Sequence, residues 1–205
     1  MATILDLIFS SVIGGAILMI LLSATDAMNE NQSVYNGDML VQEMLTSTVQ
    51  LVESEFRNMG FGVPEDQASI IHADSTQIRF LIDLDRDGGF IDTVEYYLGP
   101  TSELNKTQNE LDRYLHRTVN GGSKAQVGVV VHFNLRYITH AGELLPTPVA
   151  EDRLTEIHVV EVTVEVQNPY ALYKKASETG IGDRNAWYSS SMWQQTRLAS
   201  QNSRR

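Results

Sequence analysis

The chain has 205 residues and no cysteine, so disulfides, zinc–thiolate sites and thiol nucleophiles are excluded. Its formal net charge of -11 argues against a nucleic-acid-binding surface, because phosphate contact needs clustered Lys and Arg. The length suffices for one domain with a hydrophobic core and, in addition, an anchor.

The first predicted element is an apolar helix over residues 2–25. Its run from Ala2 to Ala24 is interrupted by a single charge, Asp6. A membrane-spanning helix needs about 20 mostly apolar residues, so we expect this segment to cross a membrane. A cleavable signal peptide would begin with Lys or Arg, whereas no basic residue precedes Arg57 here.

Asp6 favours more than a plain anchor, because a carboxylate in hydrocarbon is costly and usually has a partner. If Met1 is removed, the Ala2 amine lies about one helical turn before Asp6 and could pair with Asp6 of a neighbouring subunit. Alternatively, Asp6 lies at the lipid headgroups and interacts with the helix N-terminus. Gly14 and Gly15 would let two helices approach closely in lipid, or they mark a kink. We therefore predict an assembly surface that comprises Ala2, Asp6, Gly14 and Gly15.

Residues 26–59 are predicted to continue the helix in amphipathic form. Apolar side chains and one Thr recur every three or four residues and form one stripe: Val34, Val41, Leu45, Thr48, Val52, Phe56 and Met59. We expect this stripe to pack against the following domain. Gly60, Gly62 and Pro64 end the pattern. Poor helix formers also make a local break near 26–37 compatible with the sequence.

Residues 60–170 are predicted to form an antiparallel β head laid over the C-terminal half of the helix. Apolar and polar residues alternate around 77–82, 94–98, 129–137 and 160–166, which is typical of strands with one buried face. Tight turns are expected at 87–89, 120–122 and 141–142. The polar tail, 171–205, is predicted to be irregular, although Trp187, Tyr188 and Trp193 indicate that part of it docks on the head or on a neighbour.

One segment carries a candidate metal site. Asp83, Asp85, Asp87 and Asp92 lie around a Gly-Gly turn, and carboxylates at alternating positions can converge on Ca²⁺. The segment resembles the first half of an EF-hand loop but lacks its final Glu at the required place. The alternative is an acidic hairpin turn, in which Asp and Gly serve turn geometry.

No catalytic constellation is evident. The five histidines are scattered and form no metal-binding motif, and Ser189-Ser190-Ser191 lacks the surroundings of a nucleophile. We expect a structural protein and not an enzyme.

The order of these features resembles the minor pilins and pseudopilins of type IV pili and type II secretion systems, most closely the PilW-like minor pilins. The resemblance covers roughly residues 2–168. It is carried by Asp6 in the apolar helix and by four later segments, namely 56–64 (FRNMGFGVP), 83–98 (DLDRDG through DTVEYYL), 115–117 (LHR) and 131–137 (VHFNLRY). The family usually has a short basic leader ending in Gly and a Glu in the mature helix. Here no such leader is present and the acid is Asp, so either the sequence starts at the mature end or the subunit is processed differently.

The resemblance implies an α+β, type IV pilin-like fold and a structural subunit of a pilus or secretion filament. Its implied partners are copies of itself or related subunits, bound through the N-terminal helix. Its implied location is the bacterial inner membrane, with the head outside the cytoplasm, or an extracellular filament. The competing hypothesis is a solitary membrane-anchored β domain that binds an extracellular ligand, with Ca²⁺ as a candidate cofactor.

Overall fold

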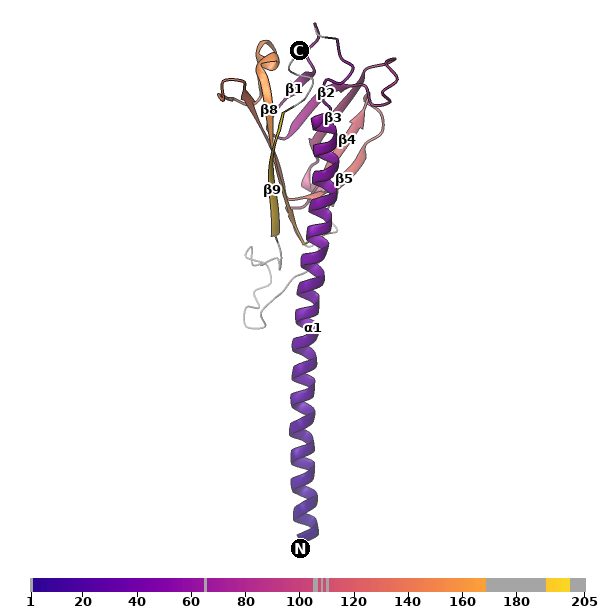
Figure 1. Ribbon diagram of the computed structural model, residues 1–205. Helices are drawn as coiled ribbons and strands as arrows, with labels where there is room; N and C mark the ends of the chain where they lie inside the picture. Colours follow the sequence, from indigo (N-terminus) through magenta and orange to yellow (C-terminus); the bar gives the residue numbers. More distant parts are fainter. Residues whose placement is uncertain are drawn as a thin grey trace.

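The protein is an α+β molecule in which one long helix carries a β-rich head at its C-terminal end (Figure 1). The computed structural model describes residues 2–64, 66–104, 107, 109, 111–168 and 191–199. Helix α1 (Ala2–Arg57) is continuous over 56 residues, or roughly 84 Å at the usual rise per residue. The break that the sequence allowed near 26–37 does not occur. The helix ends two residues before the predicted end, and 58–62 form turns.

The predicted apolar stripe on the second half of α1 is confirmed. From Val41 to Met59, every stripe residue is buried, and Val34 is half-buried. Val49, which the sequence analysis did not include, is buried as well. The stripe therefore supplies one wall of the hydrophobic core of the head.

The head contains two antiparallel sheets, whereas the sequence analysis expected one. The five-stranded sheet has the order β1-β2-β3-β4-β5 and the four-stranded sheet the order β7-β6-β8-β9. The first comprises β1 (Ile70–Ala73), β2 (Gln77–Ile82), β3 (Asp92–Leu98), β4 (Arg113–Val119) and β5 (Ala125–Val130). The second comprises β6 (His132–Thr139), β7 (Leu144–Leu145), β8 (Ile157–Gln167) and β9 (Ser191–Ala199). Short 3₁₀ helices, η1 (Thr101–Leu104) and η2 (Glu151–Glu156), lie in the connections.

The expected single strand at 129–137 is two strands that belong to different sheets. The chain leaves the first sheet at the end of β5 and enters the second at His132, and the Val131 N–H donates to the Glu165 carbonyl. Because apolar residues continue through this crossing, the alternation alone does not show where one sheet ends. The β1–β2 turn joins the sheets again, since the Tyr137 hydroxyl donates to the Asp74 carbonyl at 2.8 Å.

Part of the polar tail is ordered, and here the prediction of an irregular end was wrong. Residues 191–199 form β9, which pairs along β8 from Gln167↔Ser191 to Val159↔Ala199. Part of the tail does lie against the head, as the aromatic residues suggested, but through strand pairing: Trp193 lies opposite Glu165 and its side chain is exposed. Trp187 and Tyr188 lie outside the described residues.

Helix α1 lies between the sheets and packs against both. Phe56 meets Phe80 and Tyr96 of the first sheet edge-to-face, each at a ring-centroid distance of 5.5 Å. On β5, a Cβ added to Gly128 would lie 2.3 Å from the Thr48 hydroxyl, so only glycine permits this approach of the strand to α1. On the other side, α1 contacts β8 and β9. The two sheets thus share one core, of which the helix is the middle layer.

We predict that Phe56→Ala strongly destabilises the head. Phe56 is fully buried against two rings of the first sheet, and truncation of such a residue costs about 3–5 kcal/mol. Leu51→Ala on the exposed side of α1 is the matched control, with an expected change below about 1 kcal/mol. Urea unfolding of a fragment that begins at Ser33 measures both changes. Equal losses in the two variants would contradict the position of Phe56 in the core.

Candidate assembly helix and acidic loop

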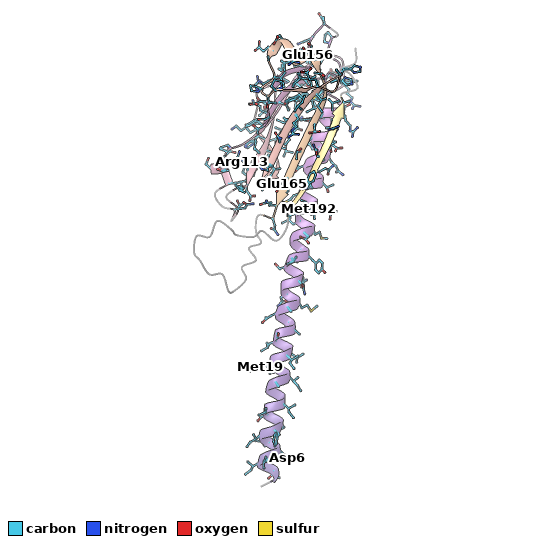
Figure 2. The ribbon with its side chains drawn as sticks, turned by 90° about the vertical axis from the view of Figure 1, so that its left-hand side faces the viewer. Asp6, Met19, Arg113, Glu156, Glu165 and Met192 are labelled. Carbon is cyan, nitrogen blue, oxygen red and sulfur yellow. The ribbon has the colours of Figure 1, made fainter. Side chains whose placement is uncertain are left out.

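The N-terminal half of α1 is bare. Every side chain from Thr3 to Asn29 is exposed, including the long run of Ile, Leu, Val and Phe. Asp6 and Met19 stand out from the helix well away from the head (Figure 2). Among the described residues there is one helix that is both long enough and apolar enough to cross a membrane, and this helix is α1. This surface is compatible with a membrane anchor or with a signal sequence.

Three hydroxyl groups on the bare half form hydrogen bonds within the helix. Ser10 and Ser11 donate to the carbonyls of Leu7 and Ile8, at 3.0 and 2.9 Å, and Thr25 donates to Leu21 at 2.8 Å. A polar group without a partner is costly in hydrocarbon. These three side chains therefore add little polarity to the surface of the segment.

The structure places the predicted assembly residues on this bare half. Asp6 is exposed, and it makes no hydrogen bond or ion pair with any residue that the structure describes. Ala2 is the first helical residue, but its side chain and Met1 are not described, so the pairing of an amine with Asp6 remains a prediction. A Cβ added to Gly14 or Gly15 would meet nothing within 4 Å. Packing within the chain therefore does not require glycine there, although Ala would favour the helix by about 1 kcal/mol.

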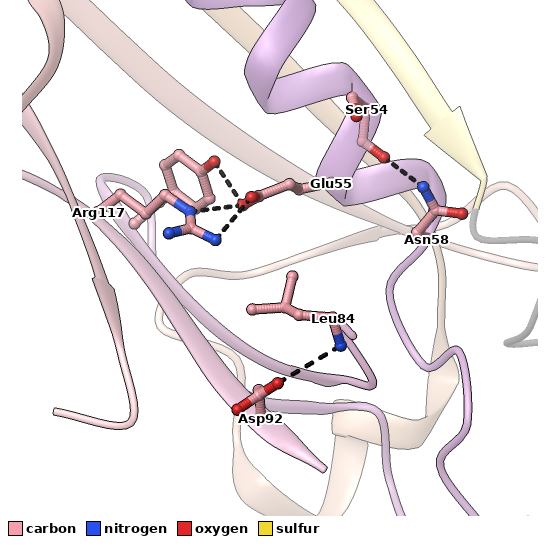
Figure 3. A network of polar contacts seen from close by, with 7 residues as sticks. Ser54, Glu55, Asn58, Leu84, Asp92 and Arg117 are labelled. Carbon is pink, nitrogen blue, oxygen red and sulfur yellow. Dashed lines mark hydrogen bonds and ion pairs between the residues drawn. The ribbon is translucent and has the colours of Figure 1, made fainter. Parts of the chain in front are cut away.

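A half-buried ion pair, which the sequence did not predict, joins the other half of α1 to the head. Glu55 accepts hydrogen bonds from Arg117 of β4, with contacts of 2.9 Å from Nε and 2.7 Å from Nη2 (Figure 3). The Tyr96 hydroxyl donates to the same carboxylate at 2.6 Å. Because both carboxylate oxygens are bonded to the guanidinium group, this contact fixes the rotation of the helix about its axis relative to the sheet. The sequence signal was an acid between the buried residues Val52 and Phe56, but its partner could be found only from the fold.

Local electrostatics keep this contact in one protonation state. Burial raises the pKa of Tyr96 far above its ordinary value, and the Glu55 carboxylate raises it further. The hydrogen bond to Glu55 raises the pKa of Arg117 in turn. Tyr96 therefore remains a neutral donor and Arg117 a cation across the physiological pH range.

The other side of α1 is joined to β9. The Thr196 hydroxyl donates to the Glu53 carboxylate at 2.7 Å, and Arg57 lies 3.7 Å from the same group. The Glu53 side chain is half-buried in this position. This contact links the helix to a strand 143 residues away in sequence.

A second ionic arrangement holds β9 in register. Glu161 of β8 lies directly opposite Arg136 of β6 and Arg197 of β9. Its carboxylate accepts a hydrogen bond from Arg197 Nε at 2.7 Å, and Arg136 lies 3.8 Å away. The bond from Arg197 holds the pKa of Glu161 below its usual range, despite the opposing effect of burial. An acid on the outer face of the central strand thus binds both neighbours.

In the acidic loop, Asp83 has a clear structural role. Its carboxylate accepts backbone N–H bonds from Arg86 at 2.8 Å and from Gly88 at 3.0 Å, and its side chain is buried. It packs beneath the turn after α1, where a Cβ on Gly62 would lie 2.6 Å from the Asp83 Cβ. The Asp83 N–H also donates to the Phe61 carbonyl. Asp83 therefore connects the end of the helix to the β2–β3 loop.

Of the other three aspartates, two have separate partners and one is exposed. Asp92 accepts bonds from the Leu84 N–H at 3.4 Å (Figure 3) and from the Asn120 amide at 2.6 Å, in the β4–β5 turn. Asp87 accepts the Gly89 N–H at 2.7 Å, and Asp85 is exposed. Within the described residues, no group of three or more Asp, Glu, His or Cys side chains is arranged to hold a metal ion. Turn geometry explains three of the four aspartates, and Ca²⁺ binding stays a prediction.

Comparison with known proteins found no similarity: no family model matches the sequence, and neither a curated protein nor a solved structure matches the chain.

We predict that Asp83→Ala lowers the free energy of unfolding by about 1–3 kcal/mol, because two backbone N–H groups lose their acceptor. Asp85→Ala is the matched control in the same loop, with an expected change within about 0.5 kcal/mol. Thermal melts of the Ser33 fragment with chelator compare the two variants.

Repeating the melts with millimolar Ca²⁺ tests the cation site. A rise in midpoint that Asp85→Ala removes would support it, and equal midpoints would retire it.

We predict that Glu161→Gln weakens the second sheet in a pH-dependent way. The folded-state pKa of Glu161 lies below its ordinary value of 4.5, so its stabilising effect is complete above that pH and is lost as pH falls through the lowered value. The variant should lose about 1–3 kcal/mol at pH 7 and show a flatter decline in stability below pH ~4.5. The control is Glu156→Gln, which removes an exposed ion pair with Arg153. A decline in acid identical to that of the unaltered chain would contradict this role.

Proposed function

We propose that this chain is a type IV pilin-like structural subunit that is anchored in a membrane and assembles into a filament through α1. The observation that carries the proposal is the difference in surroundings between the two halves of a single helix. Its first half is bare and apolar, while its second half is the middle layer of the head. Both halves belong to one continuous element, so the head cannot turn independently of the anchor.

A rigid connection of this kind suits a subunit better than a tethered binding domain. A tether needs only reach, which a flexible linker supplies at no structural cost. A filament must instead hold every head at a fixed angle to its bundled helices. The Glu55–Arg117 contact and the buried stripe fix that angle in this chain. The same continuity argues for retention of the apolar half in the functional protein and against its removal as a signal.

The assembly surface in this proposal is the bare half of α1. Asp6 pairs with the terminal amine of a neighbouring helix, and Gly14 and Gly15 allow that helix to approach. The unfilled space around both glycines supports this role, since no residue in the described part of the chain occupies it. Before assembly the helix lies in the bacterial inner membrane with the head outside the cytoplasm. After assembly it lies in the core of a pilus-like or secretion-type filament.

The rival function is a solitary anchored domain that binds an extracellular ligand. A solitary domain provides no role for Asp6. An acid within an isolated membrane span only adds about 2.5–3.5 kcal/mol to the free energy of insertion. The residue that separates the two functions is therefore Asp6.

We predict that Asp6→Ala abolishes filament assembly and leaves the head folded. Removal of the carboxylate removes the partner of the neighbour's amine, while the head lies far along α1 from Asp6 (Figure 2). Negative-stain imaging measures assembly, and thermal melting of the same material measures folding. Leu5→Ala at an adjacent exposed position is the control, which should assemble. Filaments at normal abundance from the Asp6 variant would refute the pairing.

A further inference from the structure

Between residues 6 and 43, the acidic residues of α1 leave one face of the helix free of charge. From residue 6 to residue 43 the chain has five acids and no base: Asp6, Asp26, Glu30, Asp38 and Glu43. Counted in heptads, each acid occupies a different one of the seven positions. Two heptad positions carry no acid. One of them is occupied by Leu7, Gly14, Leu21, Met28 and Tyr35. The other is occupied by Ser11, Leu18, Thr25, Gln32 and Met39. These positions alternate at spacings of four and three, the pattern by which two helices pack along a common line. We call these ten residues the 7–39 seam.

The head does not cover the 7–39 seam. Tyr35 is 73% exposed and Met39 67%, although both lie close to the head along the helix. The stripe that faces the head (Val41, Leu45, Thr48, Val52) lies roughly a third of a turn around α1 from the seam. The seam thus remains accessible on a helix whose rotation is fixed by the Glu55–Arg117 contact.

Lipid cannot cover the upper end of the seam. Tyr35 and Met39 lie about 16 and 22 Å beyond Ala24, the last residue of the apolar run. The headgroup layer on one side of a bilayer is only about 5–8 Å thick. An exposed Tyr and an exposed Met therefore continue the apolar line into water, where only another protein surface can bury them.

We propose that the 7–39 seam packs against the same seam of a second copy of this chain, as a parallel pair of helices; this proposal rests on the proposed function. In a pair related by twofold symmetry, each residue lies near its own counterpart. On any of the other five heptad positions, an acid would meet an acid with no base to neutralise it. The seam is the line along which two copies meet without that repulsion.

The composition of the seam changes along its length in a way that suits such a pair. Ser11 and Gly14 lie at the membrane end, where small residues permit close packing in lipid. Met28, Tyr35 and Met39 lie beyond the apolar run, where burial of apolar surface drives association. Gln32 lies between them, and a single polar residue in a seam favours one register. A common membrane and heads on the same side make the pair parallel.

Cysteine cross-linking tests the seam directly, because the chain contains no cysteine of its own. The seam variants are Met28→Cys and Tyr35→Cys. The matched controls, Asn29→Cys and Asn36→Cys, are the next residues along the helix, are also exposed, and point about 100° away. A disulfide needs Cα atoms within about 7 Å of each other, which a parallel pair provides only on the seam. Each full-length variant is reconstituted in phosphatidylethanolamine–phosphatidylglycerol vesicles and mildly oxidised.

We expect disulfide dimers in at least fivefold higher yield from the two seam variants than from their controls. A second change, Tyr35→Glu in the Met28→Cys chain, should reduce the dimer severalfold, whereas Asn36→Glu should not. Equal yields from seam and control positions, or a preference for the controls, would overturn the seam. If filaments form in that case, the proposed function stands without it. If no variant cross-links and no filament forms, both proposals fail.

Discussion

The structure depends on the insertion of one helix between two sheets. Each sheet is antiparallel and has one apolar face, and neither face is covered by the other sheet alone, because the second half of α1 lies between them. Phe56 fills the space toward Phe80 and Tyr96, and Val49 and Val52 lie beside Val162 and Val164 of β8. Without the helix, both apolar faces would meet water. The helix that carries the long apolar N-terminal run is therefore also the element that makes the head a folded unit.

The polar contacts of the helix add orientation to this burial. Apolar side chains tolerate small rotations of a helix, whereas the two bonds between Glu55 and Arg117 do not. Glu53 and Thr196 make a similar contact toward β9. The helix is continuous, so fixing its rotation at the C-terminal end also fixes the direction in which each side chain of the bare half points. The contacts with the head thus determine the direction in which each face of the apolar half points.

The sequence predicted the elements that local patterns define and missed those that distant contacts define. The apolar run, the amphipathic stripe and the alternation around 77–82 are periodic signals that need no partner, and they were found. The division of the head into two sheets was missed because apolar residues run unbroken through Val131 at the crossing. Strand β9 was missed because its inward face carries only Met192 and Leu198 as large apolar residues, and its register depends on Glu161 and Arg197. In the acidic loop, the choice between turn and cation site depended on where Asp83 pointed. It points to the N–H groups of Arg86 and Gly88, which composition alone could not show.

The acidic residues of the chain fall into two groups, those paired with bases in the head and those of α1 that have no base nearby. Acids that serve the fold have partners within the head: Glu55 has Arg117, Glu95 has Arg79 at 2.7 Å, and Glu161 has two arginines. The pKa of Glu95 illustrates the balance, since burial opposes its ionisation, yet the hydrogen bonds from Arg79, Gln77 and Thr118 hold the value below normal. The acids of α1 before residue 53 have no base near them in sequence, because the first basic residue is Arg57, in the last turn of the helix. Repulsion between such groups is screened only over about 8–10 Å at physiological ionic strength. In the proposed pairing, two copies of the helix would lie closer than that, so their acids would restrict the faces on which the copies can meet. Between residues 6 and 43 these acids leave the 7–39 seam uncharged, so electrostatics as well as packing would select the proposed pairing face.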